Sequence, residues 1–319
     1  MKACKRWLFT IFMAASSALT MAQEVDSLAL SGIDEVLTFD DSLSIFKLID
    51  SLLEMGDISG SSQLAVRLGY NSNVQSAGRT LGIQNFGLAP GVSFYHKSGL
   101  YADVSGYWSK EFSPSYYLTI TSLGYLHSFS KWFSIMGNYD HYFYNSNSDD
   151  AFIPYKNTLS VTPMIDLKPV LFSLNYAFYF GDDYANRIMP GLSVVLQKKK
   201  LWGINRVAIT PSFFTLFGDE TLTTFDYTIP KTLREWRANK DKYGTIFGRV
   251  QKDSRVFGVM NYAISAPITV SYKNWGFAFT YTYNIPKALK GEPLTISNSS
   301  YLSGSITYFI DLKRKKFSL

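Results

Sequence analysis

The chain has 319 residues, its lysines and arginines outnumber its acidic residues by 31 to 25, and 16% of its residues are aromatic. The single cysteine, Cys4, lies at the N-terminus, so the rest of the chain has no disulfide, no cysteine-ligated metal and no cysteine nucleophile. Beyond Ala22 no segment offers about 18 uninterrupted apolar residues, which excludes a membrane-spanning helix there.

Residues 1–22 have the pattern of a secretory signal peptide. Three basic residues near the start precede an apolar stretch, Trp7–Met13, and Thr20–Ala22 form a small-residue cleavage site. We therefore expect export through the inner membrane and cleavage before Gln23, which removes Cys4.

Residues 23–60 form an acidic segment with nine acidic residues and one lysine. Asp40 to Ser42 can cap a helix that continues to about Met55, with Gly56 as its stop. Apolar residues fall on one side of this helix, so it needs a partner. The candidates are the periplasmic mouth of a barrel, its lumen, or another protein; the alternative is a largely disordered periplasmic leader.

From residue 61 to residue 319 the chain repeats one unit: ten to fourteen residues that alternate apolar and polar, followed by a turn. This pattern is typical of an all-β, antiparallel, up-and-down transmembrane β-barrel, whose strands face lipid on one side and the lumen on the other. We predict about twelve strands, at residues 62–72, 85–97, 100–110, 116–128, 132–144, 156–167, 170–181, 187–198, 203–217, 255–272, 275–286 and 300–312.

The connections between these strands alternate in length. The short ones are predicted at 97–99, 130–131, 168–169, 198–202 and 273–274. The long ones are predicted at 73–84, 111–115, 145–155, 182–186, 218–254 and 287–299. Outer-membrane barrels have short periplasmic turns and long external loops, so this order places both chain ends in the periplasm.

Two further features concern the regularity of the strands. Three of the predicted strands present clear outer stripes, for example Phe277, Phe279 and Tyr281, between inward-facing small or polar residues. Prolines interrupt four strands and predict bulges or strand ends there; they are Pro163, Pro190, Pro211 and Pro267.

On this pattern the chain resembles the outer-membrane β-barrel proteins of Gram-negative bacteria, and its acidic leader is similar in style to those of Bacteroidetes barrels. The resemblance implies outer-membrane lipid, lipopolysaccharide and the barrel assembly machinery as partners, a possible periplasmic partner for residues 23–60, and no cofactor. Such barrels often end on an aromatic residue, whereas here Phe309 is followed by a basic tail at 313–317.

The predicted inner wall consists mostly of small polar residues, with a few charged side chains as candidate pore-lining or ligand residues. These are Arg67, Asp103, Asp140, Lys156, Asp166, Arg187 and Arg206. About twelve strands predict a lumen between that of a filled eight-stranded barrel and that of an open porin.

The long connection at 218–254 is basic, and residues 232–242 have a helix-forming composition. Its basic residues are candidates to contact lipopolysaccharide phosphates or to attract an anionic solute. Those residues are Lys231, Arg234, Arg237, Lys240 and Arg249. The alternative is a solvated surface loop; nucleic-acid binding is not indicated, because no binding fold accompanies the charge.

Catalysis has weak support. His127 and Ser128 are adjacent, and so are Asp140 and His141, so the side chains of each pair should point to opposite faces of a strand. The acidic pairs at 149–150 and 182–183 fit solvated loops, a weak divalent-cation site or a rim hydrolase, which leaves a metal site open.

The sequence thus predicts a narrow outer-membrane channel or uptake protein with a basic external loop. Anion preference is expected to depend on Arg234 and Arg237. The alternatives are a closed structural or interaction barrel and, with less support, a rim hydrolase acting on lipid or peptide.

Overall fold

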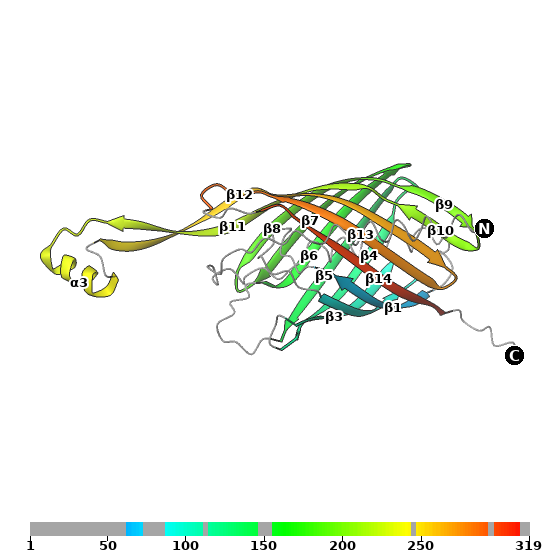
Figure 1. Cartoon of the computed structure of the whole chain (residues 1–319), viewed down its shortest axis with the longest axis horizontal. Coiled ribbons are helices and arrows are strands. Elements are labelled where there is room, and N and C mark those ends of the chain that lie inside the picture. The colour runs from blue at the N-terminus through cyan, green and yellow to red at the C-terminus, as the bar shows by residue number, and fades with distance from the viewer. Residues whose placement is uncertain are drawn as a thin grey trace, which may run out of the picture. The chain divides into compact units, whose positions relative to one another are not determined.

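The computed structural model describes residues 62–72, 87–110, 114–145, 155–243, 247–292 and 297–312, with backbone only at 222–227, 242–243 and 248–253. These residues form one antiparallel sheet of fourteen strand segments that closes on itself through a pairing of β11 with β12 (Figure 1). The predicted signal peptide, the predicted helix of the acidic segment, and the basic tail lie outside the described residues.

The strand segments follow the predicted ranges closely. They are β1 Ser62–Asn71, β2 Gly87–Tyr95, β3 Leu100–Ser109, β4 Tyr116–Ser128, β5 Phe133–Tyr144, β6 Tyr155–Leu167, β7 Val170–Gly181, β8 Tyr184–Val194, β9 Leu196–Leu201, β10 Ile204–Ile209, β11 Ser212–Thr228, β12 Gly248–Tyr272, β13 Trp275–Pro286 and β14 Ser299–Leu312.

The fourteen segments make twelve barrel strands, because two strands are each interrupted once. β8 and β9 are separated only by Val195, and β10 and β11 only by residues 210–211. The pairing keeps one register across both interruptions, since Ile209 pairs with Leu196 and Ser212 with Ser193. The predicted antiparallel barrel of twelve strands is therefore confirmed.

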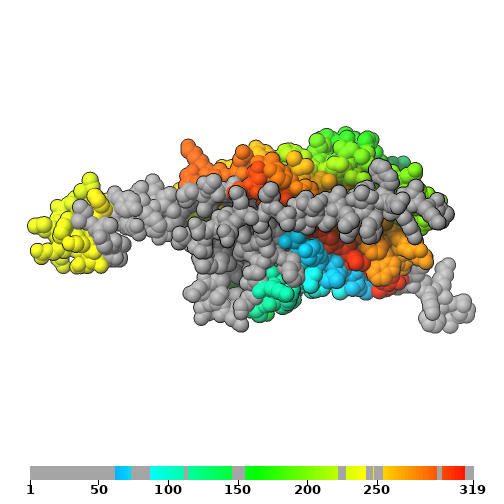
Figure 2. All heavy atoms as spheres, in the orientation of Figure 1, coloured from blue at the N-terminus to red at the C-terminus, as the bar shows by residue number. Residues whose placement is uncertain are grey.

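The ring closes where the first strand meets the last. β1 pairs with β14 from Ser62↔Leu312 to Asn71↔Ser303. Figure 2 shows this seam, with the blue atoms of the first strands against the red atoms of β14. Within the ring each strand thus has a neighbour on both sides, which satisfies the backbone groups that lipid could not hydrogen-bond. The segment β9, which continues past the end of the β7–β8 ladder at the short-turn rim, pairs with β10 alone.

Short and long connections alternate mostly as predicted. The β9–β10 turn is shorter than expected, because β9 continues to Leu201 and leaves only Trp202 and Gly203 between the strands. The β7–β8 connection, predicted to be long, consists of Asp182 and Asp183 alone. Ser62 and Leu312 lie at the rim that carries the short turns.

The outer surface of the ring is apolar. Leu123, Leu174 and Phe279 are among many large apolar side chains that are about half exposed. Aromatic side chains lie near both rims: Phe129, Trp132, Trp202, Tyr272, Trp275 and Tyr308 at the short-turn end, and Tyr70, Tyr116, Phe143 and Tyr184 at the other. A monomeric soluble protein rarely exposes so continuous an apolar surface, whereas aromatic girdles around an apolar band are typical of barrels in a bilayer.

Among the described residues, no helix has the length and hydropathy required to cross a membrane.

The prolines are accommodated in a different way from the one predicted. Pro211 lies at a strand end, as expected, but Pro163, Pro190 and Pro267 lie inside continuous strands, and the register does not shift at any of them. Each instead falls in a short gap of the pairing with one neighbour: β6–β7, β8–β11 or the side of β12 that faces β10 and β11. Proline has no N–H, so a local loss of pairing on one side removes the missing donor from the ladder.

The predicted loop at 218–254 is wrong for most of its length. β11 runs on to Thr228 and β12 starts at Gly248, so residues 219–228 and 248–257 pair as a two-stranded ribbon beyond the ends of β8 and β13 (Figure 1). The connection at its end contains the predicted helix, α3 Leu233–Tyr243. Thr232 caps the start of this helix, because its Oγ1 accepts from the Glu235 N–H at 3.2 Å, and the Glu235 carboxylate accepts from the Lys231 N–H at 2.8 Å.

We predict that a charge on the outer face destabilises the barrel. Phe279 lies in the middle of β13 and is 50% exposed on the outer face. Phe279→Arg should therefore lower the unfolding free energy in lipid vesicles by about 2–4 kcal/mol, measured by urea titration. Phe279→Leu serves as the control and should cost much less; equal stability of the Arg variant would contradict the lipid-facing assignment.

Candidate functional site

The inner wall of the barrel carries most of the buried polar side chains. Five of them form a row across neighbouring strands, here called the polar belt: Ser93, Asp103, Ser122, Asp140 and Thr158. The strand register makes each the direct partner of the next, from β2 to β6. Alternation along each strand therefore places two carboxylates and three hydroxyls side by side on the wall.

Asp103 is held by hydroxyls and by one arginine. Ser93 Oγ donates to its Oδ1, and Ser105 Oγ donates to its Oδ2 at 2.6 Å. Arg67 on β1 lies 3.5 Å from the carboxylate and donates to Ser105 Oγ at 2.7 Å. Arg67 reaches β3 by crossing over Gly91, where a Cβ atom would lie 3.1 Å from the guanidinium.

Asp140 is held without a cation in direct contact among the described residues. It accepts hydrogen bonds from Ser122 Oγ at 2.5 Å and from Asn138 Nδ2 at 2.6 Å. Tyr101 crosses over Gly124 and donates to Asn138 Oδ1 at 2.8 Å. The hydrogen-bond donors to this carboxylate are thus uncharged hydroxyl and amide groups.

Apolar clusters flank the polar belt on the inner wall. Tyr101, Met136 and Met164 lie toward the short-turn rim, and Leu118, Ile120 and Tyr142 lie toward the opposite rim. A third cluster joins β8, β11 and β12, and consists of Met189, Phe214, Leu216, Met260, Ala263 and Leu289. Leu289 comes from the β13–β14 connection, so that connection folds inward onto the wall.

The remaining predicted lining residues lie in different places. Arg206 is buried at the short-turn end, where its Nε donates to Gln197 Oε1 at 2.9 Å. Asp166 is partly exposed at the same rim, 3.9 Å from Lys168. Lys156 is half exposed at the opposite rim and pairs with Asp182 at 2.9 Å. Of the seven, the structure brings only Arg67, Asp103 and Asp140 into one neighbourhood.

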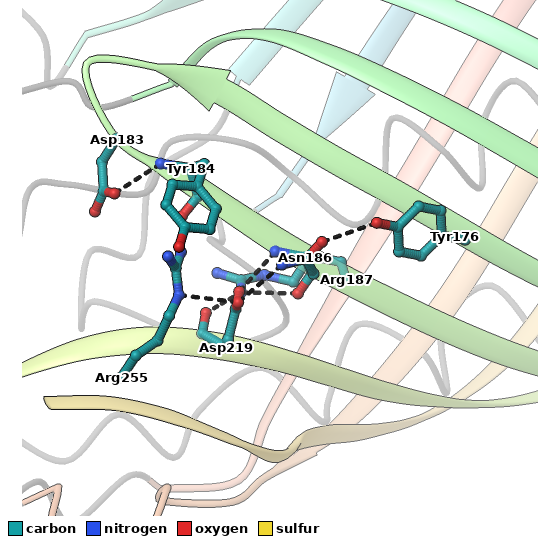
Figure 3. A network of polar contacts seen from close by, with 7 residues as sticks. All are labelled: Tyr176, Asp183, Tyr184, Asn186, Arg187, Asp219 and Arg255. Atoms are coloured by element: carbon teal, nitrogen blue, oxygen red, sulfur yellow. Dashed lines mark hydrogen bonds and ion pairs between the residues drawn. The ribbon is translucent and has the colours of Figure 1, made fainter.

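Arg187 belongs to a network that the sequence reading did not find (Figure 3). Its centre is Asp219, which is 6% exposed and lies where β8 stops pairing with β11. Asp219 Oδ1 accepts from the Asn186 N–H at 2.6 Å, and Oδ2 accepts from Asn186 Nδ2 at 2.9 Å. The carboxylate thus replaces the backbone acceptor that β11 would otherwise supply.

Two arginines neutralise Asp219. Arg187 Nη1 lies 3.7 Å from Oδ1 and donates to the Asp219 carbonyl, while Arg255 Nε lies 3.0 Å from Oδ2. Arg255 also stacks on Tyr184, 3.6 Å from the ring centroid. β8, β11 and β12 are therefore tied together at the base of the ribbon.

The sequence contained only a weak signal for Asp219, which fell in the predicted connection at 218–254. The stretch 221–228, however, is rich in threonine and aromatic residues, which favour strands.

The basic residues predicted to contact lipopolysaccharide lie on the ribbon and its helix. Lys231, Arg234, Arg237 and Lys240 are exposed, and Lys240 Nζ lies 5.4 Å from the centroid of the Trp236 ring. Arg249 lies on β12 within the ribbon. Ile229 and Leu233 beside them are 78% and 79% exposed.

The residues considered for hydrolysis do not converge within the described chain. Asp140 faces Ser122 on the inner wall, whereas His141 is bound to Asn157 Oδ1 at 2.7 Å on the other face. His127 is exposed and stacks on Tyr125. Asp182 pairs with Lys156, and residues 149–150 lie outside the described residues. The described residues contain no cluster of three or more His, Cys, Asp and Glu placed for a metal.

Comparison with solved structures finds porins. The chain aligns with the KdgM porin at 8% identity and a TM-score of 0.42, covering 77% of this chain and 98% of that one. It aligns with the NanC porin at 10% identity and a TM-score of 0.38, covering 78% of this chain and 100% of that one. The outer-membrane channel DcaP of Acinetobacter baumannii aligns at 7% identity and a TM-score of 0.30, covering 78% of this chain and 96% of that one.

No protein-family model matches the sequence, and no curated protein matches it.

We predict that Gly124 is required for the inner wall. A Cβ atom at Gly124 would overlap the Tyr101 ring, so Gly124→Ala should displace Tyr101 from Asn138 and cost about 1–3 kcal/mol of unfolding free energy. Gly137→Ala on the neighbouring strand is the control, because its Cβ would meet nothing within 4 Å. Urea unfolding in vesicles measures both; equal effects would contradict the role given to Gly124.

We predict that neutralising Asp219 weakens the base of the ribbon. Asp219→Asn leaves the buried Arg187 without its carboxylate, which should cost about 3 kcal/mol. Asp183→Asn is the matched control, because Asp183 is exposed and should change stability by less than about 0.5 kcal/mol. Unfolding titrations that do not separate the two variants would contradict this account.

Proposed function

We propose that this chain is a narrow channel or uptake protein in the outer membrane of a Gram-negative bacterium. The observation that supports it is a closed ring of twelve strands with an apolar outer face and an inner wall rich in small polar side chains. Twelve strands enclose less space than the sixteen or so of an open porin, so passage would be limited to small solutes.

The charges on the inner wall favour weak ion selectivity. Arg67 lies 3.5 Å from Asp103, and Arg187 lies 3.7 Å from Asp219, so these two arginines are each offset by a carboxylate. Buried Asp140 and Arg206 add one charge of each sign at separate places, so a permeating ion would meet charges of both signs instead of a continuous field of one sign.

The ribbon changes the expected role of Arg234 and Arg237. Ten residue pairs, from Asp219↔Phe257 to Thr228↔Gly248, precede the connection that carries α3. At about 3.3 Å per residue the ribbon is about 30 Å long, several times the Debye length of about 8 Å at physiological salt. We therefore propose that ion preference depends on the inner wall and no longer on these two arginines.

A closed interaction barrel is the second candidate. It is favoured by the ribbon, which presents exposed Ile229 and Leu233 beside basic residues. Outer-membrane lipid, lipopolysaccharide and the barrel assembly machinery, a periplasmic partner for residues 23–60, and a Bacteroidetes origin remain predictions. A rim hydrolase has no converging residues in support within the described chain.

Single-channel recording of the refolded chain from Gln23 onward in a planar bilayer tests the proposal. We expect small, steady openings with a reversal potential near zero in a salt gradient. Arg67→Gln leaves Asp103 without its cation and should shift the reversal potential toward cation preference, because the belt then carries excess negative charge.

Arg234→Gln/Arg237→Gln is the control and should leave the reversal potential unchanged. If a folded, correctly inserted barrel gave no channel openings, that result would contradict the channel and favour the closed interaction barrel. A large change of the reversal potential in the control variant would mean that the arginines of the ribbon set the ion preference.

A further inference from the structure

The rim that carries the short turns bears a ring of positive charge, here called the lysine ring. Each short connection contains or adjoins at least one exposed lysine, and the up-and-down order of the strands places all of these connections around one mouth of the barrel. The members of the ring, from β2–β3 to β12–β13, are Lys97, Lys131, Lys168, Lys198, Lys199, Lys200 and Lys273.

The lysine ring has few carboxylates to offset it. Within the described chain, two aspartates lie at this rim: Asp166, which is 3.9 Å from Lys168, and Asp311, which accepts a hydrogen bond from Gln63 at 2.9 Å. At the opposite rim the charges are paired, as Lys156 is with Asp182 at 2.9 Å. Because like charges around one mouth repel each other, an anionic partner would lower the free energy of the short-turn rim.

Apolar side chains lie on the inner wall just inside the lysine ring. Tyr95 on β2, Leu126 on β4 and Leu171 on β7 are half-buried and pack against the buried cluster of Tyr101, Met136 and Met164. Each of the three half-buried residues lies within five residues of a lysine of the ring along the chain. The mouth therefore combines an apolar inner edge with a cationic outer edge, which is the complement of an acidic amphipathic segment.

The chain itself contains such a segment next to this rim. Residues 33–60 hold seven acidic residues and one lysine, and the chain continues from them directly into β1 at Ser62. Ser62 Oγ accepts a hydrogen bond from the Lys97 N–H at 3.4 Å, so the chain enters the barrel beside the lysine ring. The helix predicted between residues 40 and 55 would present one apolar side, made of Leu43, Phe46, Ile49, Leu52 and Leu53.

The lengths of the segment and of the mouth agree. Twelve strands about 4.8 Å apart and tilted by about 40° enclose a ring about 25 Å across. A helix of about 16 residues is about 24 Å long, so the predicted helix can span the mouth. Ion pairs between exposed groups are individually weak, but a short tether supplies an effective concentration in the millimolar range, which makes several weak contacts sufficient.

We propose that residues 33–60 dock across the short-turn mouth of the barrel. Their acidic side chains lie against the lysine ring, and their apolar side chains pack on Tyr95, Leu126 and Leu171. Docking requires the rim alone, whereas its consequence, a restricted entrance to the lumen, rests on the proposed channel function.

Limited digestion by trypsin tests the docking without requiring conduction. Lys47 is the single lysine or arginine between Gln23 and Gly60, so trypsin has one site in the segment. The substrate is the folded chain from Gln23 onward in micelles of a neutral detergent that contains no phosphate. At low salt, cleavage after Lys47 should be about tenfold or more slower than in a synthetic peptide of residues 33–60. This difference should shrink in 1 M salt, where the Debye length is about 3 Å.

Neutralising the lysine ring should expose the segment. The rim variant is Lys97→Gln/Lys131→Gln/Lys168→Gln/Lys199→Gln; Lys200 and Lys273 stay in place because their φ angles are positive. Cleavage after Lys47 should become about fivefold or more faster than in the wild type at low salt, because the docked segment has lost much of its counter-charge.

The matched control removes the same number of positive charges at the end of the ribbon. It is Lys231→Gln/Arg234→Gln/Arg237→Gln/Lys240→Gln, which changes exposed side chains only. Its net charge equals that of the rim variant, and cleavage after Lys47 should proceed at the wild-type rate.

A second variant changes the segment and leaves every described strand intact. Glu54→Gln/Asp57→Asn lies seven and ten residues beyond Lys47 and should also accelerate its cleavage, relative to a peptide with the same two changes. Combined with the rim variant it should add little, because both variants remove the same interaction.

Cleavage of the wild type at the rate of the peptide, or equal rates in the rim and ribbon variants, would overturn the proposal. So would loss of the protection when phosphatidylglycerol is added to the micelles, because the lysines would then bind lipid phosphates in preference to the segment. Protection of Lys47 in a barrel that conducts no ions would refute the channel and leave the docking standing; steady conductance with an unprotected Lys47 would do the reverse.

Discussion

Closure of the sheet is the constraint on which the rest of this structure depends. A strand in lipid must satisfy each backbone N–H and C=O within the protein, and the pairings of β1 with β14 and of β11 with β12 close the ring. The interrupted strands show the same requirement, because β8 with β9 and β10 with β11 keep one register across their breaks. Prolines are accepted where one ladder has a gap, so the loss of a donor stays local.

Closure also explains how the inner wall is packed. Several long side chains of the inner wall lie flat along it instead of extending toward the axis of the ring. Arg67 crosses Gly91, Tyr101 crosses Gly124 and Phe214 crosses Gly191. A glycine one strand away makes each of these positions possible, and the tip of the side chain then reaches a partner two strands away, as Tyr101 reaches Asn138.

The ribbon begins where closure ends. Beyond Arg187 the β8 strand no longer pairs with β11, and the Asp219 carboxylate accepts the hydrogen bond from the Asn186 N–H. Its burial is compatible with a charge only because Arg187 and Arg255 lie on either side. The same residues that finish the barrel wall thus start the ribbon, so the two parts depend on one buried charge cluster.

Much of this architecture could be read from local pattern. Alternation along 170–181 and 275–286 predicted which residues face lipid, because the side-chain period of a strand is two and each residue depends only on its position along the strand. The helix at the end of the ribbon was also predictable, since residues 232–242 contain both a cap and helix-forming residues.

The contacts that define the site were not predictable in this way. Arg67 with Asp103, Tyr101 with Asn138, and Ser265 with Thr282 join residues of different strands. Residues 218–228 fell in a predicted connection, yet pairing with β12 holds the segment in a strand. The sequence by itself therefore determined the number of strands and the face of each, which are local properties of the chain. Only the tertiary structure decided which side chains meet across the ring, because register between strands arises from closure of the whole sheet.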